Sequence, residues 1–254
     1  MYFRGDFEII SAENIADGFY DFTLRSDREL NAECGQFAHI LCGDKTLRRP
    51  ISICDFDNEK GTLRIVFEVR GEGTEWMSER KCGDILDVIA PIGHGFTIGD
   101  TDRHAVFVGG GIGTPPLLAG CKRYGENATA ILGFRNSGAV ILKDDFERAA
   151  GKVMVTTDDG SFGRHGLVTE PLEEVLKREV CDIIYACGPR PMLKAIAQKA
   201  FEYGVECEVS LEERMGCGIG ACLVCACRIN RGGEEKNLHV CKDGPVFNAK
   251  EVVW

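Results

Sequence analysis

The stretch that decides the fold runs from Met215 to Arg228 and reads Met-Gly-Cys-Gly-Ile-Gly-Ala-Cys-Leu-Val-Cys-Ala-Cys-Arg. Together with one later cysteine it has the spacing C-x4-C-x2-C followed by a distant Cys, which is typical of plant-type [2Fe–2S] clusters. Its three alternating glycines allow a tight loop whose amide groups turn inward, toward the sulfurs of a cluster. The stretch therefore predicts a [2Fe–2S] cluster with four thiolate ligands, Cys217, Cys222, Cys225 and Cys241.

Three other uses of these cysteines stay open. A structural zinc site usually takes its ligands as two C-x2–4-C pairs, whereas three of the four cysteines here share one loop. Disulfides would suit a secreted protein, but the N-terminal residues show no basic region followed by an apolar run. Cys227 follows Cys225 by two positions and is an alternative to it as a ligand.

Length and charge limit the remaining possibilities. The 254 residues are enough for two domains with separate cores. The formal net charge of −10 argues against a nucleic-acid partner, which requires clustered Lys and Arg. No stretch approaches the ~18 apolar residues that span a bilayer, so we expect no membrane association and a cytoplasmic protein with reduced cysteines. The cysteines outside the cluster stretch are then expected to be small and mostly buried: Cys34, Cys42, Cys54, Cys82, Cys121, Cys181 and Cys207.

Residues 1–98 have the pattern of short strands separated by turns. Apolar or alternating segments of strand length occur at 7–10, 19–24, 37–42, 49–53, 63–69 and 84–89. Six strands at this spacing predict a small antiparallel barrel. One helix is expected over 73–80, with Thr74 as its N-cap.

Two features of this barrel indicate a flavin nucleotide. The pair Arg48-Arg49 on a predicted strand offers a guanidinium fork for a pyrophosphate, and Ser52 offers a hydroxyl to a flavin ring. The turn Gly71-Glu-Gly-Thr74 opens a helix whose free amides attract an anion. A solvated Arg pair and an ordinary turn are the alternatives. The flavin interpretation is favoured because both features precede a nucleotide-binding pattern.

That pattern begins with a buried strand at 104–108, a glycine turn at 109–113 and a helix at 114–124. A strand, a glycine turn and a helix in this order form the phosphate-binding arrangement of dinucleotide folds. Further strands are expected at 128–133, 152–157 and 182–187, and helices at 171–178 and 191–203. This alternation predicts a parallel, doubly wound sheet.

The carboxyl ends of such strands border the binding crevice. The turn Cys187-Gly-Pro189 leaves room for a flat ring close to the backbone, although a simple strand-to-helix turn would look the same. Asp158 and Asp159 end another strand, where a carboxylate would accept from a ribose 2′-hydroxyl and repel a 2′-phosphate. These residues favour NAD over NADP, with an ordinary Asp-Asp-Gly turn as the alternative.

Over its whole length the chain resembles the ferredoxin–NADP reductase superfamily, and within it the electron-transfer subunits of class 1B dihydroorotate dehydrogenase. The resemblance lies in four motifs, Arg49-Pro-Ile-Ser52, Gly109-Gly-Gly-Ile-Gly-Thr-Pro-Pro116, Met215-Gly-Cys-Gly-Ile-Gly-Ala-Cys222 and Gly244-Pro-Val-Phe247. It implies a six-stranded antiparallel FAD-binding β-barrel at 1–98 and a Rossmann-like α/β domain with a parallel sheet, binding NAD, at 99–210. It also implies a C-terminal [2Fe–2S] subdomain at 211–254.

The resemblance also implies which residues contact the cofactors. The expected FAD contacts are Arg49, Pro50, Ile51, Ser52, Val66, Phe67, Glu68, Gly73 and Thr74. The expected NAD contacts are Gly109, Gly110, Gly111, Ile112, Gly113, Thr114, Cys187, Gly188 and Pro189. Ile51 stands where the wider superfamily usually has an aromatic residue, which leaves Phe247 either as a packing partner of the isoalloxazine or as a core residue. No catalytic acid or base is expected, because the cofactors carry the chemistry.

The implied function is electron transfer in pyrimidine biosynthesis. A separate FMN-containing dihydroorotate dehydrogenase catalytic subunit would oxidise dihydroorotate to orotate, and this chain would pass the electrons through [2Fe–2S] and FAD to NAD+. The family implies a heterotetramer of two catalytic and two electron-transfer subunits. Two other functions stay open. One is the flavin and iron–sulfur subunit of another complex, such as a ferredoxin:NADP transhydrogenase, a sulfide dehydrogenase or a soluble hydrogenase. The other is a zinc-stabilised nucleotide-binding module.

Overall fold

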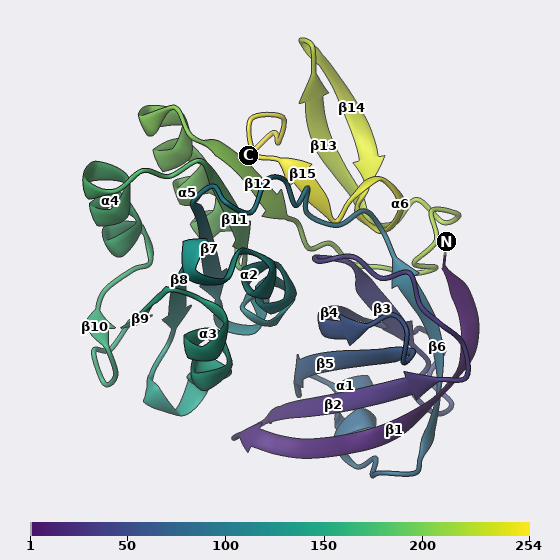
Figure 1. The fold of residues 1–254 in the computed structure, drawn as a ribbon. Coiled ribbons are helices and arrows are strands. Elements are labelled where there is room, and N and C mark those ends of the chain that lie inside the picture. The colour runs from purple at the N-terminus through teal and green to yellow at the C-terminus, as the bar shows by residue number, and fades with distance from the viewer. Residues whose placement is uncertain (1) are drawn as a thin grey trace.

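The computed structural model describes residues 2–254. It contains a closed barrel, a seven-stranded sheet flanked by helices, and a two-stranded hairpin (Figure 1). The barrel comes first in the chain, and the segment after the sheet lies across the top of both in the view of Figure 1. The predicted combination of a barrel, an α/β unit and a C-terminal cluster segment is therefore confirmed.

All six strands of the barrel pair antiparallel, in the spatial order β1-β2-β5-β4-β3-β6. Side chains on alternate positions fill its interior, where Phe22 and Phe67 meet edge to face with ring centres 5.2 Å apart. The strands are β1 (Phe3–Ala16), β2 (Phe19–Ser26), β3 (Phe37–Ile40), β4 (Arg49–Asp57), β5 (Thr62–Glu68) and β6 (Ile85–Ile92).

Helix α1 (Glu72–Ser78) covers part of the barrel and begins earlier than predicted. Its N-cap is Gly71, so the prediction of Thr74 as N-cap is wrong. Thr74 occupies the third helical position, and its Oγ1 accepts hydrogen bonds from the backbone N–H of Arg70 (2.9 Å) and of Gly71 (3.3 Å). The threonine thus reaches back over the turn, as the third residue of a capping box does.

The second sheet has the order β10-β9-β8-β7-β11-β12-β15 and is parallel except for its last strand. The strands expected at 104–108, 128–133, 152–157 and 182–187 correspond to β7, β8, β9 and β11 and pair parallel, as predicted. The additional strand β15 pairs antiparallel with β12. The strands are β7 (Ala105–Gly110), β8 (Ala128–Phe134), β9 (Lys152–Thr157), β10 (Arg164–His165), β11 (Ile183–Cys187), β12 (Glu206–Ser210) and β15 (Val246–Asn248).

Helices cover both faces of this sheet. The helices are α2 (Leu118–Tyr124), α3 (Lys143–Ala149), α4 (Thr169–Arg178) and α5 (Arg190–Tyr203). Leu118 and Phe146 from α2 and α3 pack on one face, and Leu172 and Ile196 from α4 and α5 pack on the other. The predicted doubly wound arrangement is confirmed.

The helix expected over 114–124 becomes regular only at Leu118. Two 3₁₀ turns, η1 (Gly111–Gly113) and η2 (Pro115–Leu117), precede it, and two further short 3₁₀ turns, η3 (Gly125–Asn127) and η4 (Ser137–Ala139), occur later in the chain. Pro115 and Pro116 have no amide hydrogen to donate, so this part of the chain forms the tighter turn instead of an α-helix.

The C-terminal segment forms the hairpin of β13 (Ala226–Arg231) and β14 (Glu234–His239), then α6 (Val240–Asp243) and β15. The hairpin projects away from the rest of the chain (Figure 1). Two backbone hydrogen bonds attach the turn after α6 to both larger units: the N–H of His94 donates to the carbonyl of Gly244 (2.6 Å), and that of Leu211 to the carbonyl of Pro245 (2.8 Å). The cysteine loop is thereby held between the barrel and the sheet.

Arg64 on β5 links the barrel to the helical layer of the second unit. Its guanidinium lies 2.6 Å from a carboxylate oxygen of Asp21 on β2 and 2.9 Å from one of Asp145 on α3. Burial opposes ionisation of Asp145, but the guanidinium of Arg64 outweighs it and lowers the pKa of that carboxyl. The link is therefore an ionised triad in a partly desolvated place.

We expect Arg64→Met to lower the free energy of unfolding by roughly 2 kcal/mol at neutral pH, because it leaves two partly buried carboxylates without a counter-charge. The folded-state pKa of Asp145 is depressed, so its contribution is present above the ordinary Asp pKa of about 3.9 and is lost as the pH falls below it. The difference between wild type and variant should shrink accordingly. Urea unfolding followed by circular dichroism, at neutral pH and below the ordinary Asp pKa, measures this difference in unfolding free energy.

Lys60→Met is the matched control, because Lys60 pairs with Asp57 on the exposed surface of the barrel. Its effect should stay within about 0.5 kcal/mol. An Arg64→Met variant as stable as Lys60→Met would contradict the linking role of Arg64.

Candidate functional site

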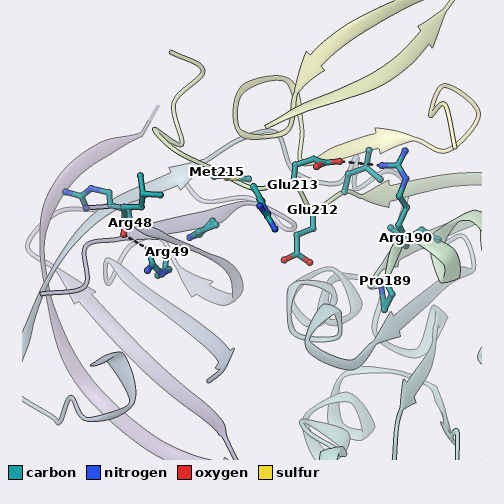
Figure 2. Close-up of a pocket in the computed structure, with 13 residues that line it drawn as sticks. Arg48, Arg49, Pro189, Arg190, Glu212, Glu213 and Met215 are labelled. Carbon is teal, nitrogen blue, oxygen red and sulfur yellow. Dashed lines mark hydrogen bonds and ion pairs between the residues drawn. The ribbon is translucent and has the colours of Figure 1, made fainter. Parts of the chain in front are cut away.

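A pocket of about 540 Å³ opens between the barrel and the sheet (Figure 2). One wall carries Arg49 and Pro50 from the predicted FAD motif, and the opposite wall carries Gly188 and Pro189 from the predicted NAD motif. The chain that leads into the cysteine loop, residues 211–215, forms a further wall. Residues expected to hold two different cofactors thus border one space, at a size that suits part of a nucleotide cofactor.

The two neighbouring arginines of the barrel have different surroundings. Arg48 is 15% exposed, and its guanidinium donates to the carboxylate of Asp87 (2.7 Å) and to the carbonyl groups of Asp87 (2.9 Å) and His39 (3.2 Å). Arg49 lies against Gly73 instead, where an added Cβ would come within 2.8 Å of its Cζ. Arg49, which the resemblance implies as an FAD contact, is therefore the arginine of the pair that lies at the start of α1.

The predicted contacts Val66, Phe67 and Glu68 lie on β5 where its neighbour β4 diverges. The two strands pair from Ile53 to Asp57 of β4, whereas residues 49–52 of β4 pair with β3. One backbone edge of residues 66–68 is thus not paired with a strand. Because the Phe67 side chain is buried inside the barrel, its contact with a ligand would be through this backbone edge.

The two predicted NAD loops touch each other backbone to backbone. A Cβ on Gly113 would lie 2.6 Å from the carbonyl oxygen of Cys187 and from Cα of Gly188. A Cβ on Gly110 would lie 2.5 Å from the Met192 sulfur. Thr114 is fully buried and its Oγ1 has no hydrogen-bond partner within residues 2–254. The structure therefore joins the two motifs into one surface at the carboxyl ends of β7 and β11.

Two of the open interpretations are decided by side-chain contacts. Asp159 accepts hydrogen bonds from the hydroxyl (2.6 Å) and the amide (2.9 Å) of Ser161, which lowers the pKa of its carboxyl, so it serves the turn. Asp158 is exposed at the end of β9 and is left as the candidate for a ribose contact. Phe247 is 3% exposed in the core beneath the sheet, so it is a core residue.

Backbone amides of the cysteine loop point at the cysteine sulfurs. The Cys217 sulfur accepts from the N–H of Ala221 (3.2 Å) and Cys222 (3.3 Å), and the Cys241 sulfur accepts from the N–H of Gly220 (3.1 Å). Gly218 and Gly220 have φ of +72° and +83°, the left-handed region that such inward amides require. This is the arrangement expected around a thiolate-ligated cluster.

The four predicted ligands form two pairs. Cys225 and Cys241 have sulfurs 3.3 Å apart, and Cys217 and Cys222 exchange N–H···S hydrogen bonds of 3.3 Å. No three Cys, His, Asp or Glu side chains within residues 2–254 are arranged to hold one metal ion. Two thiolate pairs fit a diiron cluster, in which each iron takes two protein ligands, and do not fit a single zinc ion that needs four together.

The pKa values of these thiols follow their surroundings. Burial opposes ionisation of Cys217, but the amides directed at its sulfur outweigh burial and lower its pKa to about 7. Burial and the adjacent Cys225 thiol raise the pKa of Cys241 to about 12. The Cys241 thiol therefore retains a proton that a bound iron would displace, which couples ligation to pH.

Other cysteines have different positions. Cys227 packs in the core beside Ile229, while Cys225 meets Cys241. Cys225 is thus the better-placed ligand of the two. Outside the loop, Cys82 is exposed and Cys181 half-buried, so the expectation of mostly buried cysteines fails for Cys82. It follows α1 in a turn, where no core lies beneath it.

Several residues of the site were not predicted. Glu212, Glu213, Arg190 and Met215 line the pocket, and the Arg190 guanidinium lies 3.5 Å from the Glu213 carboxylate (Figure 2). His39 is also unpredicted: it is fully buried next to the cysteine loop. Burial and the charge of Arg48 lower its pKa to about 4, so the ring is neutral.

A closed barrel next to a doubly wound sheet, with a shared pocket and an appended cysteine loop, defines a reductase of the ferredoxin–NADP reductase type that carries an iron–sulfur segment. A solved NADH-dependent reduced ferredoxin–NADP oxidoreductase supports this class. The two are 36% identical, with a TM-score of 0.86 over 98% of this chain and 90% of that chain. A ferredoxin reductase in carbazole 1,9a-dioxygenase, 21% identical with a TM-score of 0.69 over 80% of this chain and 67% of that one, shares the fold.

The family model for the iron–sulfur cluster binding domain of dihydroorotate dehydrogenase B matches residues 212–253. The electron transfer subunit of dihydroorotate dehydrogenase B (NAD+) from Geobacillus thermodenitrificans is 41% identical over 96% of both chains. The subunit of that name from Caldanaerobacter subterraneus is 44% identical over 97% of both. The chain belongs to the family of dihydroorotate dehydrogenase B electron transfer subunits.

We expect Gly73→Ala to weaken FAD binding about tenfold, because the new methyl group displaces the Arg49 guanidinium and removes a charge-assisted contact. Gly71→Ala is the control in the same turn, since a Cβ there meets nothing within 4 Å. Titration of the flavin-free protein with FAD, followed by flavin fluorescence, measures both. Equal affinities of the two variants would contradict the role of Arg49.

We expect the Cys225→Ser variant to lose the [2Fe–2S] cluster, and with it about two iron atoms per chain and the visible absorption. The reason is that Cys225 supplies half of the buried pair. Cys227→Ser and the exposed Cys82→Ser should both keep their iron. Iron analysis of anaerobically purified protein decides, and loss of iron in Cys227→Ser with retention in Cys225→Ser would exchange their assignments.

Proposed function

We propose that the protein passes electrons from an FMN-containing dihydroorotate dehydrogenase catalytic subunit to NAD+ in pyrimidine biosynthesis. The observation that carries the proposal is that the chain lining the pocket continues directly into the cysteine loop. Met215 lines the pocket and Cys217 follows it by two residues. The chain thus brings a one-electron centre to the wall of a two-electron site.

When bound, the [2Fe–2S] cluster supplies one-electron transfer, FAD supplies both one- and two-electron transfer, and NAD+ accepts a hydride. The residues of this chain bind and orient these groups. Arg49 and Gly73 would hold the pyrophosphate of FAD, and the open edge of residues 66–68 would hold its ring system. Cys217, Cys222, Cys225 and Cys241 would hold the cluster.

The nucleotide would enter from the other wall of the pocket. Two loops would hold NAD, through Gly109, Gly110, Gly111, Ile112, Gly113, Thr114, Cys187, Gly188 and Pro189. Gly188 lies close to Gly110, and because neither residue has a side chain, their backbone stays open to a ligand. We assign these residues binding and positioning roles and place the site of dihydroorotate oxidation in the partner. The segments 1–98, 99–210 and 211–254 accordingly serve as FAD, NAD and cluster units.

The surface of the cysteine loop suits a protein partner. Ile219, Leu223 and Val224 are exposed apolar side chains, and the ligand Cys222 is exposed beside them. A second pocket, of about 330 Å³, opens beside Cys241 between the loop and the end of β6. Exposed apolar side chains next to a redox centre favour a docking surface for the catalytic subunit.

We infer a heterotetramer of two catalytic and two electron-transfer subunits, and a location in the cytoplasm. All 13 cysteines, each within residues 2–254, are unpaired by disulfides, which fits a reducing compartment. The helices within residues 2–254 include none with the length and hydropathy required to cross a membrane.

A second candidate is the corresponding subunit of a ferredoxin–NADP oxidoreductase. The 36% identity over 98% of this chain to the solved oxidoreductase favours it. The two functions share every cofactor and differ in the partner. Co-purification with an FMN-containing subunit and dihydroorotate-dependent reduction of NAD+ would favour the first function, and ferredoxin-dependent reduction would favour the second.

The test is reconstitution with the FMN-containing subunit. The wild-type complex should form orotate and NADH together from dihydroorotate and NAD+. The Cys225→Ser complex should lose that coupled activity while the purified subunit still oxidises NADH with ferricyanide, because the flavin and nucleotide sites remain. Coupled activity that persists without the cluster would overturn the proposed route.

A further inference from the structure

His39 lies on β3 with its side chain on the outer surface of the barrel wall. Ala38 and Ile40 pack in the barrel core, so the alternation of the strand directs His39 to the opposite face. Pro50 of β4 is its pairing partner on one side, and the Arg48 guanidinium donates to its carbonyl group (3.2 Å). The backbone that carries the imidazole is thus held firmly next to the strand of the FAD motif.

The imidazole ring lies against the cysteine loop. A Cβ added to Gly218 would come within 2.8 Å of Cε1 and 3.0 Å of Cγ of His39, and closer still to Nδ1. Burial and the charge of Arg48 lower the pKa of His39, and the backbone carbonyl groups of Arg48 and Cys217 oppose that shift without reversing it. The ring therefore spans the gap between the flavin-binding strand and the first ligand of the cluster.

Both ring nitrogens are buried, and neither makes a hydrogen bond of standard geometry within residues 2–254. The hydroxyl of Thr114 is the other buried side-chain group there of which this is true. An unsatisfied buried polar group lowers the stability of the folded state, and an apolar side chain at this position would avoid that loss. The imidazole therefore calls for an explanation other than packing.

We infer that His39 is a positioning residue for the iron–sulfur cluster, whose Nδ1–H donates to the Cys217 carbonyl when the loop closes on its four thiolates and raises the cluster's reduction potential. The inference rests on the proposed function. A donor behind the ligand fixes the conformation of Cys217 and Gly218, and with it the amides that point at the sulfurs. Its dipole also stabilises an electron added to the cluster.

The test is a redox titration of the cluster, followed by electron paramagnetic resonance of the anaerobic holoprotein. In His39→Leu the equilibrium between oxidised and reduced cluster should shift about tenfold toward the oxidised form, which is ~59 mV for one electron. His39→Gln keeps an N–H donor and should recover most of this shift. His165→Leu, on the exposed edge strand β10, should leave the potential unchanged.

A second pair of variants measures the contact with the loop. Gly218→Ala should reduce cluster content and shift the spectrum in the wild type, because the methyl group displaces the ring and the residue keeps a φ of +72°. In a His39→Ala background the clash between the new methyl group and the imidazole is absent, so Gly218→Ala should reduce the cluster content less than it does in the wild type. An equal loss in both backgrounds would show that ring and loop are not coupled and would overturn the inference.

The outcomes distinguish a failure of the proposed function from a failure of the role assigned to His39. Wild-type protein without iron would overturn the proposed function together with this inference. A fully loaded His39→Leu protein with the wild-type potential would overturn the role of His39 alone, and so would a His39→Gln protein shifted as far as His39→Leu. Failure of His39→Leu to load iron, with normal loading of His39→Gln, would support positioning by the N–H group.

Discussion

Hydrogen bonds from backbone amides to cysteine sulfurs are the interaction on which the rest of this structure depends. Thiolates gathered in one loop repel one another, and the N–H groups of residues 219–222 offset that charge. The amides reach the sulfurs because Gly218 and Gly220 adopt positive φ. A Cβ at Gly216 would come within 3.1 Å of the Cys222 sulfur, so glycine is favoured there by a close approach and at the other two positions by a positive φ.

The barrel and the sheet together form the pocket that lies next to the cysteine loop. The pocket takes one wall from each unit, so its shape depends on their relative orientation. Arg64 and Lys122, through Asp145 and Asp55, cross between the two units as ion pairs. Electron transfer and hydride transfer both need fixed separations, and these ion pairs help to fix the orientation of one unit against the other.

Much of this arrangement was visible in the sequence because it rests on local patterns. Cysteine spacing, alternation in the barrel strands and the glycine turn each occupy a short window. Helix α3 was not predicted because its sequence is mainly charged and offers only Phe146 and Ala149 to the core. The role of Thr74 was misassigned by one turn, because a threonine at the third helical position resembles an N-cap.

The missing site residues share a different cause. His39 is one polar residue in an apolar strand. Its imidazole lies against a loop about 180 residues later in the chain, and a short sequence window cannot reveal such a long-range contact. Glu212 and Met215 line the pocket because the chain between β12 and the loop crosses it. Arg48 and Arg49 are adjacent in sequence, and only their neighbours in space separate a structural arginine from a binding one.

The antiparallel strand β15 has a consequence for the stability of the sheet. It covers β12, which would otherwise end the sheet with unpaired backbone groups, and it is joined to the cysteine loop through α6. Release of the metal would loosen the stretch that carries β15. Loss of the cofactor and exposure of the unpaired edge of β12 would then occur in the same local unfolding step. Iron would thus stabilise the edge of the sheet as well as the cysteine loop, because the short stretch of residues 241–246 belongs to both.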